Sequence, residues 1–257
     1  NTEAASNPQE VTFLWDNPQL GEYNFGVNAV VNVNNAVVII DEKILFPIEE
    51  VINGYYSEPT EFIDITPEIK AEAQKLAQGE DDLYVVIFNI AEWVEKNIKY
   101  DLNTLTADVV QKSSWVLENK AGVCDELTNL FISMVRSLGV PARFVSGVAY
   151  TNVNNNWGPH GWAEVYFPDK GWVPFDVTYR QFGWIDPTHI KLKVSRDSGE
   201  STIRYSWRSS NVNIESKKIN ISAEVITVGE KVLPFDFKIR PLADKVGPGS
   251  YVPIELE

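Results

Sequence analysis

The sequence GVCDELTNLFISMVRSLGVPAR, residues 122–143, carries the clearest helical pattern in the chain. Apolar side chains follow Cys124 at steps of three and four residues, which places them on one face of a helix: Leu127, Phe131, Met134 and Leu138. Gly139 and Pro141 end this helix, because glycine suits the position after a helix and proline cannot continue one. Cys124 is therefore expected in the first helical turn, on the buried face.

Three strands are predicted after this helix. Alternating apolar residues and turn signals place them at 142–150, 160–167 and 172–178. The last two are separated by the turn sequence PDKG at 168–171, which suits a hairpin. A helix with one apolar face packed on an antiparallel sheet is the α+β class.

The register of this hairpin decides whether His160 and Asp176 share a face of the sheet. If Phe167 pairs with Trp172 around a four-residue turn, His160 and Asp176 point to opposite faces. A shared face requires a different register. We therefore expect a longer loop or a bulge, for which Pro174 is one place because proline cannot donate to the ladder.

The rest of the chain divides into a core and two β-rich flanks. Residues 1–65 form the N-terminal flank, where apolar and polar residues alternate at 23–33. Residues 66–195 form the core, and residues 196–257 form the C-terminal flank. Further helices are predicted at 66–79, 83–99 and 113–118, and further strands at 189–194, 202–207, 219–228 and 235–239.

A thiol at a helix N-terminus is expected to lose its proton more readily than a free thiol. Free backbone N–H groups and the positive end of the helix dipole favour the thiolate, which is the nucleophilic form. His160 and Asp176 follow Cys124 on the two hairpin strands. A thiol, an imidazole and a carboxylate are the nucleophile, base and orienting group of covalent acyl transfer, whereas singly each residue is as readily structural.

Four ordered blocks resemble the transglutaminase-like core of the prokaryotic type: GVC at 122–124, GVPAR at 139–143, HGWAEVY at 160–166 and GWVPFDVT at 171–178. The resemblance covers about residues 80–195 and implies a papain-like fold. It also implies a papain-like thiol mechanism, with Cys124 as the nucleophile, His160 as the base and then the acid, and Asp176 orienting His160. An acyl-enzyme would then form on a peptide or side-chain amide. Water would release it in a protease-like enzyme, and an amine in a transglutaminase.

Composition narrows the expected cofactors and partners. The 257 residues include 36 acidic and 22 basic side chains, and a net charge of −14 repels nucleic acid and anionic lipid. A peptide or protein substrate is expected, and nucleic acid is not. One cysteine and two histidines exclude a paired-cysteine zinc site and a histidine-rich metal site, so neither metal nor cofactor is predicted. Oligomeric state is left open.

The rival to an enzyme is a non-catalytic module that keeps the fold and binds peptides in the same groove. A third interpretation, acetyl transfer from a thioester cofactor, is opposed by the negative charge. The intact Cys-His-Asp set favours the enzyme. An oxyanion hole would use the Cys124 N–H and a side-chain donor, with Tyr100 and Trp115 as candidates. His189 also lies in a segment that resembles prokaryotic relatives and is interpreted as structural.

The chain opens at Asn1 on a polar tract and its apolar runs are too short for a membrane helix. We expect a mature or trimmed extracytoplasmic protein, with any membrane contact made through a precursor anchor absent from this chain. A cytoplasmic enzyme is the alternative, since a single thiol suits both compartments.

Overall fold

The computed structural model describes residues 11–16, 18–33, 37–48, 54–106, 110–151 and 155–200, followed by residues 206–208, 212–217, 219–229, 238–243, 245, 247 and 251–256. Contacts divide the chain into two compact units, residues 1–32 and 33–257, and each is described by itself. No helix within the described residues is long and apolar enough to cross a membrane.

The described helices match the predicted ones. They are α1 (Pro67–Leu76), α2 (Leu83–Asn97), α3 (Ser113–Asn119) and α4 (Cys124–Ser137), with the short 3₁₀ turns η1 (Gly54–Tyr56) and η2 (Leu102–Thr106). The Thr66 hydroxyl caps α1 by accepting from the N–H of Ile69, and the Asp82 carboxylate caps α2 by accepting from the N–H of Tyr84. Gly139 follows α4 at a φ of 83°, the left-handed conformation that glycine adopts without strain.

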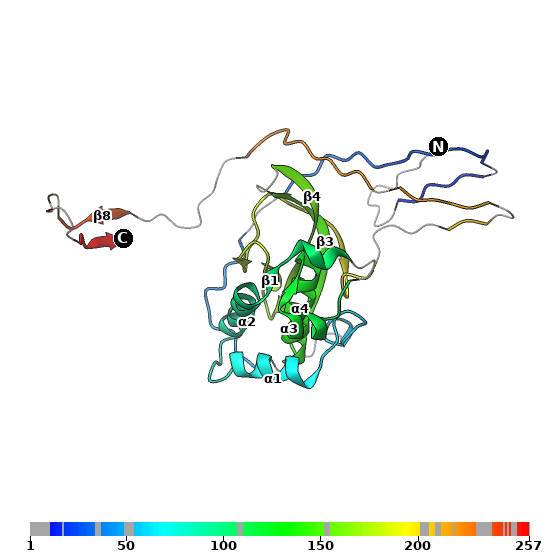
Figure 1. Cartoon of the computed structure of the whole chain (residues 1–257). Coiled ribbons are helices and arrows are strands. Elements are labelled where there is room, and N and C mark those ends of the chain that lie inside the picture. The colour runs from blue at the N-terminus through cyan, green and yellow to red at the C-terminus, as the bar shows by residue number, and fades with distance from the viewer. Residues whose placement is uncertain are drawn as a thin grey trace. The chain divides into compact units, whose positions relative to one another are not determined.

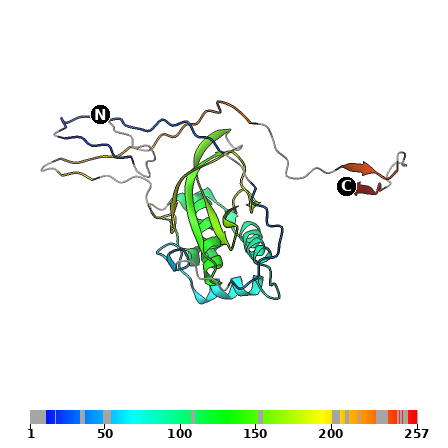
Figure 2. The same ribbon diagram turned by 180° about the vertical axis from the view of Figure 1, so that it is seen from behind.

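Five strands form one antiparallel sheet in the order β6-β5-β4-β3-β7 (Figures 1 and 2). Their bounds are β3 (Ala142–Thr151), β4 (Asn156–Phe167), β5 (Gly171–Asp176), β6 (Gln181–Phe182) and β7 (His189–Ser195). The helix α4 contacts β3 and β4 on one side and α1, α2 and α3 on the other. The α+β class and the Cys124 helix on an antiparallel sheet are therefore confirmed.

Because α4 is buried in the centre of the core, its polar side chains need hydrogen-bond partners within the protein. Every residue from Glu126 to Arg136 is buried. The Arg136 guanidinium donates to the carbonyl oxygens of Ala142, Glu58 and Arg196 at 2.7–3.0 Å. These bonds compensate for burying its charge, and they tie the loops around the sheet to the central helix.

The hairpin register resolves the conflict between His160 and Asp176. Phe167 pairs with Gly171 rather than with Trp172, and the ladder then continues without a shift to the pair Ala163 and Phe175. The expectation of a longer loop or a bulge is wrong, because the connecting loop is one residue shorter than the predicted turn. Asp169 and Gly171 adopt positive φ angles of 60° and 81°, which is how so short a connection closes.

The predicted β-rich flanks contain little hydrogen-bonded strand among the described residues. Before β1 (Lys99–Tyr100), the only β pairing among the described residues is an isolated antiparallel bridge between Leu45 and Asp82. In the first unit, aromatic rings pack with centroids 5.1–6.2 Å apart: Phe13, Trp15, Tyr23 and Phe25. An alternating pattern needs a partner strand before it forms a ladder, and the described residues at 23–33 and 219–228 form none.

The C-terminal flank has one described antiparallel pair, β8 (Ile239–Pro241) with β9 (Ile254–Leu256). The strands predicted at 202–207 and 235–239 lie mostly outside the described residues. The predicted strand at 189–194 is confirmed as β7. The domain limits at residues 65 and 195 stay a prediction.

Candidate active site

Cys124 is the first residue of α4, as predicted. The strand β2 (Ala121–Gly122) pairs in parallel with β1 and ends two residues before Cys124. Gly122 lies so close to the first helical turn that an added Cβ would be 2.9 Å from the Cβ of Glu126. The Glu126 carboxylate accepts a hydrogen bond of 2.9 Å from the N–H of Val123, the N-cap residue. The helix therefore begins abruptly, with Cys124 at its end.

The N-terminus of α4 occupies the edge of β4 at a point where β5 does not pair with it. The β4–β5 ladder reaches only Ala163, which leaves the backbone of Gly161 available to another partner. The Thr128 hydroxyl donates to the Gly161 carbonyl at 3.2 Å, and the Gly161 N–H donates to the Cys124 sulfur. The thiol is thereby held beside the residue that follows His160.

Gly161 has no room for a side chain. An added Cβ would lie 2.7 Å from the Asp125 carboxylate and 2.4 Å from the Phe144 ring. We expect Gly161→Ala to push α4 away from β4, lowering the free energy of unfolding by roughly 1–3 kcal/mol and slowing alkylation of Cys124 or any thiol-dependent turnover. Urea unfolding and thiol labelling measure the two effects.

The matched control for that substitution is Gly158→Ala on the same strand. An added Cβ at Gly158 meets nothing within 4 Å. It should therefore change stability by less than about 0.5 kcal/mol. Equal effects of the two substitutions would show that the close approach at Gly161 does not position the thiol.

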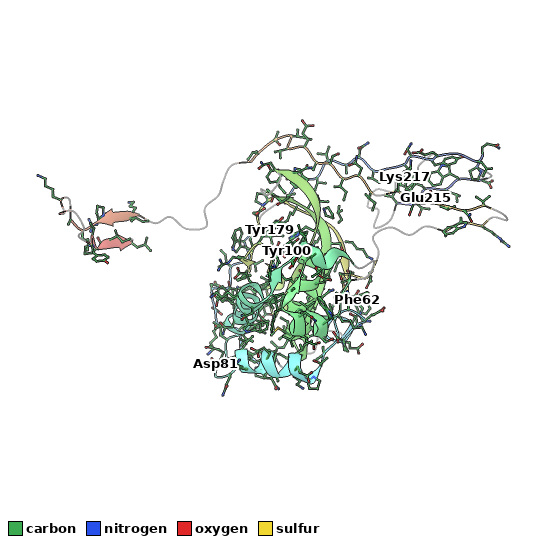
Figure 3. The ribbon with its side chains drawn as sticks, viewed as in Figure 1. Phe62, Asp81, Tyr100, Tyr179, Glu215 and Lys217 are labelled. Carbon is green, nitrogen blue, oxygen red and sulfur yellow. The ribbon has the colours of Figure 1, made fainter. Side chains whose placement is uncertain are left out.

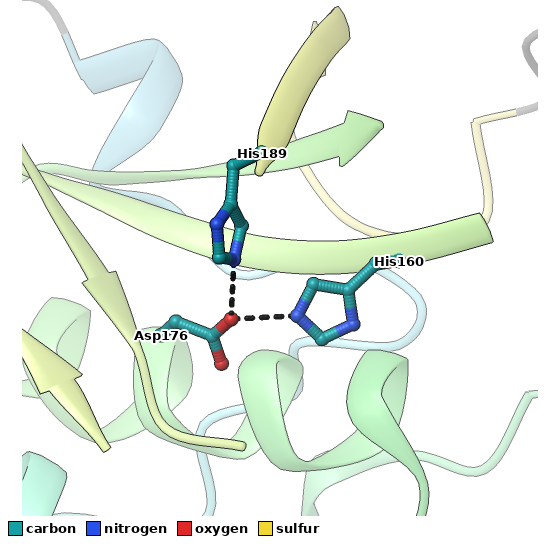
Figure 4. A group of neighbouring side chains, drawn as sticks. All are labelled: His160, Asp176 and His189. Atoms are coloured by element: carbon teal, nitrogen blue, oxygen red, sulfur yellow. Dashed lines mark hydrogen bonds and ion pairs between the residues drawn. The ribbon is translucent and has the colours of Figure 1, made fainter. Parts of the chain in front are cut away.

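His160 and Asp176 are in direct contact (Figure 4). The Nε2 of His160 is 2.6 Å from Oδ2 of Asp176, which is fully buried. The ring of Tyr179 stacks on that of His160 with a centroid distance of 4.5 Å and an angle of 14°. Stacking and the hydrogen bond together fix the plane of the imidazole. The hydrogen bond to Asp176 uses Nε2, so the other ring nitrogen, Nδ1, is not engaged by that carboxylate.

Asp176 is held as an anion. Its Oδ1 accepts hydrogen bonds from the N–H groups of Thr178 and Tyr179 at 2.8 and 3.0 Å. Its Oδ2 accepts from His189 Nε2 at 3.1 Å as well as from His160 (Figure 4). Burial opposes the charged form, but the hydrogen bonds from the two histidines outweigh it and lower the pKa of Asp176 to about 2.

Contrary to the expectation from the helix dipole, the Cys124 thiol is held neutral. Burial raises its pKa well above the ordinary value, and the negative charge of Asp125 raises it further. The sulfur is 3.6 Å from Oδ1 of Asp125, to which the thiol donates. Desolvation therefore exceeds the stabilisation of the thiolate by the helix N-terminus. A thiolate forms only when the thiol transfers its proton to a neighbouring base.

The two candidates for an oxyanion donor lie in different surroundings. The Tyr100 hydroxyl makes hydrogen bonds with the N–H and the thiol of Cys124, and burial raises the pKa of Tyr100 to about 12. Figure 3 shows Tyr100 close to Tyr179, in agreement with the electrostatic interaction between them. Trp115 instead packs against the hydrophobic core from α3 and lines a surface hollow with Glu61 and Lys112.

His189 is the residue whose surroundings were not predicted. One ring nitrogen of His189, one ring nitrogen of His160 and a carboxylate oxygen of Asp176 lie within 4.8 Å of one another, close enough to hold a metal ion. Both imidazoles, however, direct a nitrogen at the same carboxylate oxygen at hydrogen-bond distances. Protons between nitrogen and oxygen account for this arrangement, so we assign the cluster as a hydrogen-bond network. The segment DPTH at 186–189 was the available sequence signal, but it does not reveal the distant partner Asp176.

Residues 70–177 match the sequence model of the transglutaminase-like superfamily. The match includes Cys124, His160 and Asp176, and the fold of this core is transglutaminase-like. A protein of Cytophaga hutchinsonii, provisionally described as a cysteine protease, superposes with a TM-score of 0.53 and 20% identity. The superposition covers 63% of this chain and 53% of that one. At this level of identity the likeness concerns the fold alone.

Two sequence relatives are longer proteins. The uncharacterized protein YebA of Bacillus subtilis is 28% identical in an alignment of 202 positions that covers 70% of this chain and 27% of YebA. A protein-glutamine gamma-glutamyltransferase of Pseudomonas aeruginosa is 26% identical in an alignment of 74 positions that covers 26% of this chain and 11% of that enzyme. The chain therefore spans less than a third of either relative.

Proposed function

We propose that the protein is a thiol-dependent amide hydrolase or acyl transferase, with Cys124 as the nucleophile. The observation that supports this proposal is the buried His160–Asp176 hydrogen bond, together with the interactions of the Cys124 thiol with the Gly161 backbone and the Asp176 charge. In the proposed site Asp176 orients the imidazole through Nε2, so Nδ1 is the nitrogen that accepts the thiol proton. The transglutaminase-like core supports the general kind of chemistry.

The proposed reaction has two halves. The thiol proton passes to Nδ1 of His160, and Sγ attacks the carbonyl carbon of an amide to form a tetrahedral oxyanion. The imidazolium then protonates the leaving amine, the C–N bond breaks, and a thioester on Cys124 remains. Water or a second amine gives its proton to the same nitrogen and attacks the thioester, which releases an acid or a new amide and restores the thiol.

The test of this function is covalent trapping on the single cysteine. The protein is incubated with peptide libraries, with and without a lysine analogue, and Cys124 is examined by mass spectrometry for acyl adducts. Products with the amine attached support transfer, and free acids support hydrolysis. If no peptide acylates Cys124 while the same peptides bind reversibly, the non-catalytic peptide-binding module is the better description.

Tyr100 is the proposed side-chain donor to the oxyanion, together with the N–H of Cys124. Removing one such donor is expected to lower kcat by roughly 10²–10³-fold with little change in KM, because the bond strengthens only in the transition state. Steady-state kinetics of Tyr100→Phe checks this. Trp115→Phe, the other sequence candidate, should leave kcat within about threefold, given its place in the core. An unchanged or raised kcat in Tyr100→Phe would overturn the assignment.

Partners and location are proposed on composition. The net charge of −14 favours a peptide or protein substrate over nucleic acid. We keep the extracytoplasmic location as a proposal, with a cytoplasmic enzyme as its alternative. The upstream codons of the gene, followed by cell fractionation, decide between them: a signal or anchor segment supports the first, and an initiator methionine directly before Asn1 supports the second.

A further inference from the structure

A second imidazole is built onto the carboxylate of the His160–Asp176 pair. His189 is the first residue of β7, and its side chain is fully buried. Its Nε2 is 3.1 Å from Oδ2 of Asp176, the oxygen that also meets His160 (Figure 4). Its Nδ1 is 3.2 Å from both the carbonyl oxygen and Oδ1 of Asp186. Both ring nitrogens thus face acceptors only.

Asp186 is itself fixed by the loop between β6 and β7. Its carboxylate accepts from the Gln181 amide at 2.6 Å and from the N–H of Thr188 at 2.8 Å. Its own N–H donates to the Gln181 side-chain oxygen at 2.8 Å. The loop therefore presents a rigid carboxylate to Nδ1 of His189. These bonds leave the imidazole little freedom to turn away from Asp176.

An imidazole with acceptors at both nitrogens is expected to carry both protons. Burial opposes this charge, but the hydrogen bonds that His189 donates to Asp176 and Asp186 outweigh it and raise the pKa of His189 to about 9. The titratable groups that face His189 are Asp176 at the end of β5, Asp186 in the loop, His160 on β4 and Tyr179 in the turn after β5. The two nearest are acidic, so the cation has matched partners.

We propose that the Asp186–His189 pair is a positioning unit for the site: the His189 imidazolium holds Asp176 ionised and keeps its Oδ2 directed at His160. This inference rests on the proposed function for its purpose, but its physical content concerns only the described residues. The positive charge also disfavours protonation of neighbouring groups. His189 thereby lowers the pH at which the Cys124 thiol becomes reactive.

The pH dependence of Cys124 alkylation tests this without any substrate. Because the chain has one cysteine, iodoacetamide labelling followed by mass spectrometry reports on Cys124 alone. In His189→Gln, an amide replaces the imidazolium, and the midpoint of the labelling profile should move to higher pH by about one unit. A role limited to packing would lower stability and leave the midpoint in place. That outcome would overturn the proposal.

The matched control removes a positive charge from the same strand without touching Asp176. Lys191 lies two residues along β7, and its ammonium pairs with Glu164 at 2.6 Å. Lys191→Gln should leave the labelling midpoint unchanged. If it shifts the midpoint as much as His189→Gln does, the effect is one of overall charge and the positioning role is rejected.

A second measurement covers the case in which His189→Gln fails to fold. The chain has two histidines, so His160→Gln leaves His189 as the only imidazole signal in an NMR titration. That signal should titrate at about pH 9, the value that the two carboxylates impose. Adding Asp186→Asn should lower the midpoint by at least about one unit. Titration near pH 6.5 in both proteins would show that His189 is not held as a cation. The labelling and NMR results do not depend on acyl trapping with peptides, so this inference and the proposed function can fail separately.

Discussion

Replacing Cys124 with alanine is expected to abolish acyl transfer, with a rate loss of at least about 10⁴-fold, while the protein stays folded. The thiol is the only group at the start of α4 that can form a thioester. Its removal deletes one small side chain at a half-buried position, so Tm should change by less than about 4 °C. Turnover assays and calorimetry measure the two quantities.

The companion variants separate chemistry from packing. Cys124→Ser should be as inactive as the alanine variant, and His160→Ala should lose activity while remaining folded, since the base is then missing. If Cys124→Ala unfolds the protein, Cys124 is a packing residue rather than a nucleophile. Retained turnover in Cys124→Ala would place the chemistry elsewhere.

Asp176→Asn is expected to be the most damaging isosteric change, with roughly a 10⁴-fold loss of turnover. One carboxylate receives four hydrogen-bond donors, two on each oxygen. An asparagine that keeps the backbone bonds turns its NH₂ toward the nitrogens of His160 and His189. To accept a hydrogen bond from that NH₂, His189 must give up its Nε2 proton and with it the positive charge, while Nδ1 still donates to Asp186.

The same change should lower the free energy of unfolding by about 3–5 kcal/mol, as expected when a buried charge pair loses a partner. The folded-state pKa of Asp176 lies below its ordinary value of 3.8, so its contribution is present above pH 3.8 and is lost as the pH falls toward about 2. The variant should lack that part of the acid dependence. Urea unfolding between pH 2 and pH 6 measures it.

Asp169→Asn is the control for this substitution. Asp169 is exposed in the loop of the same hairpin and has a positive φ, which asparagine tolerates. It should change stability by less than about 0.5 kcal/mol. If the two substitutions behave alike, the hydrogen bonds on Asp176 contribute nothing to fold or activity.

Helix periodicity was the most informative part of the sequence for the fold. The step pattern after Cys124 predicted α4 because this signal is local, and the predicted helices at 66–79 and 83–99 correspond to α1 and α2. The alternating pattern of the flanks was less informative. A strand needs a partner from elsewhere in the chain, and alternation does not say which segment supplies it.

The register of the hairpin was also not predicted from the sequence, and here the difference is a single residue. Sequence favoured a four-residue turn, whereas positive φ angles at Asp169 and Gly171 close a shorter one. That single step puts His160 and Asp176 on one face. Turn conformation is decided together with the packing of both strands, so the pattern of residues alone leaves it open.

By itself the sequence determined which residues could carry thiol chemistry: one cysteine at a predicted helix start, followed by a histidine and an aspartate on neighbouring strands. Only the tertiary structure decided their states. The thiol is neutral because burial exceeds the effect of the helix N-terminus, and Asp176 is charged because four donors converge on it. It also brought His189 from β7 to the same carboxylate. Desolvation and convergent hydrogen bonds depend on contacts between distant segments, and local sequence does not encode those contacts.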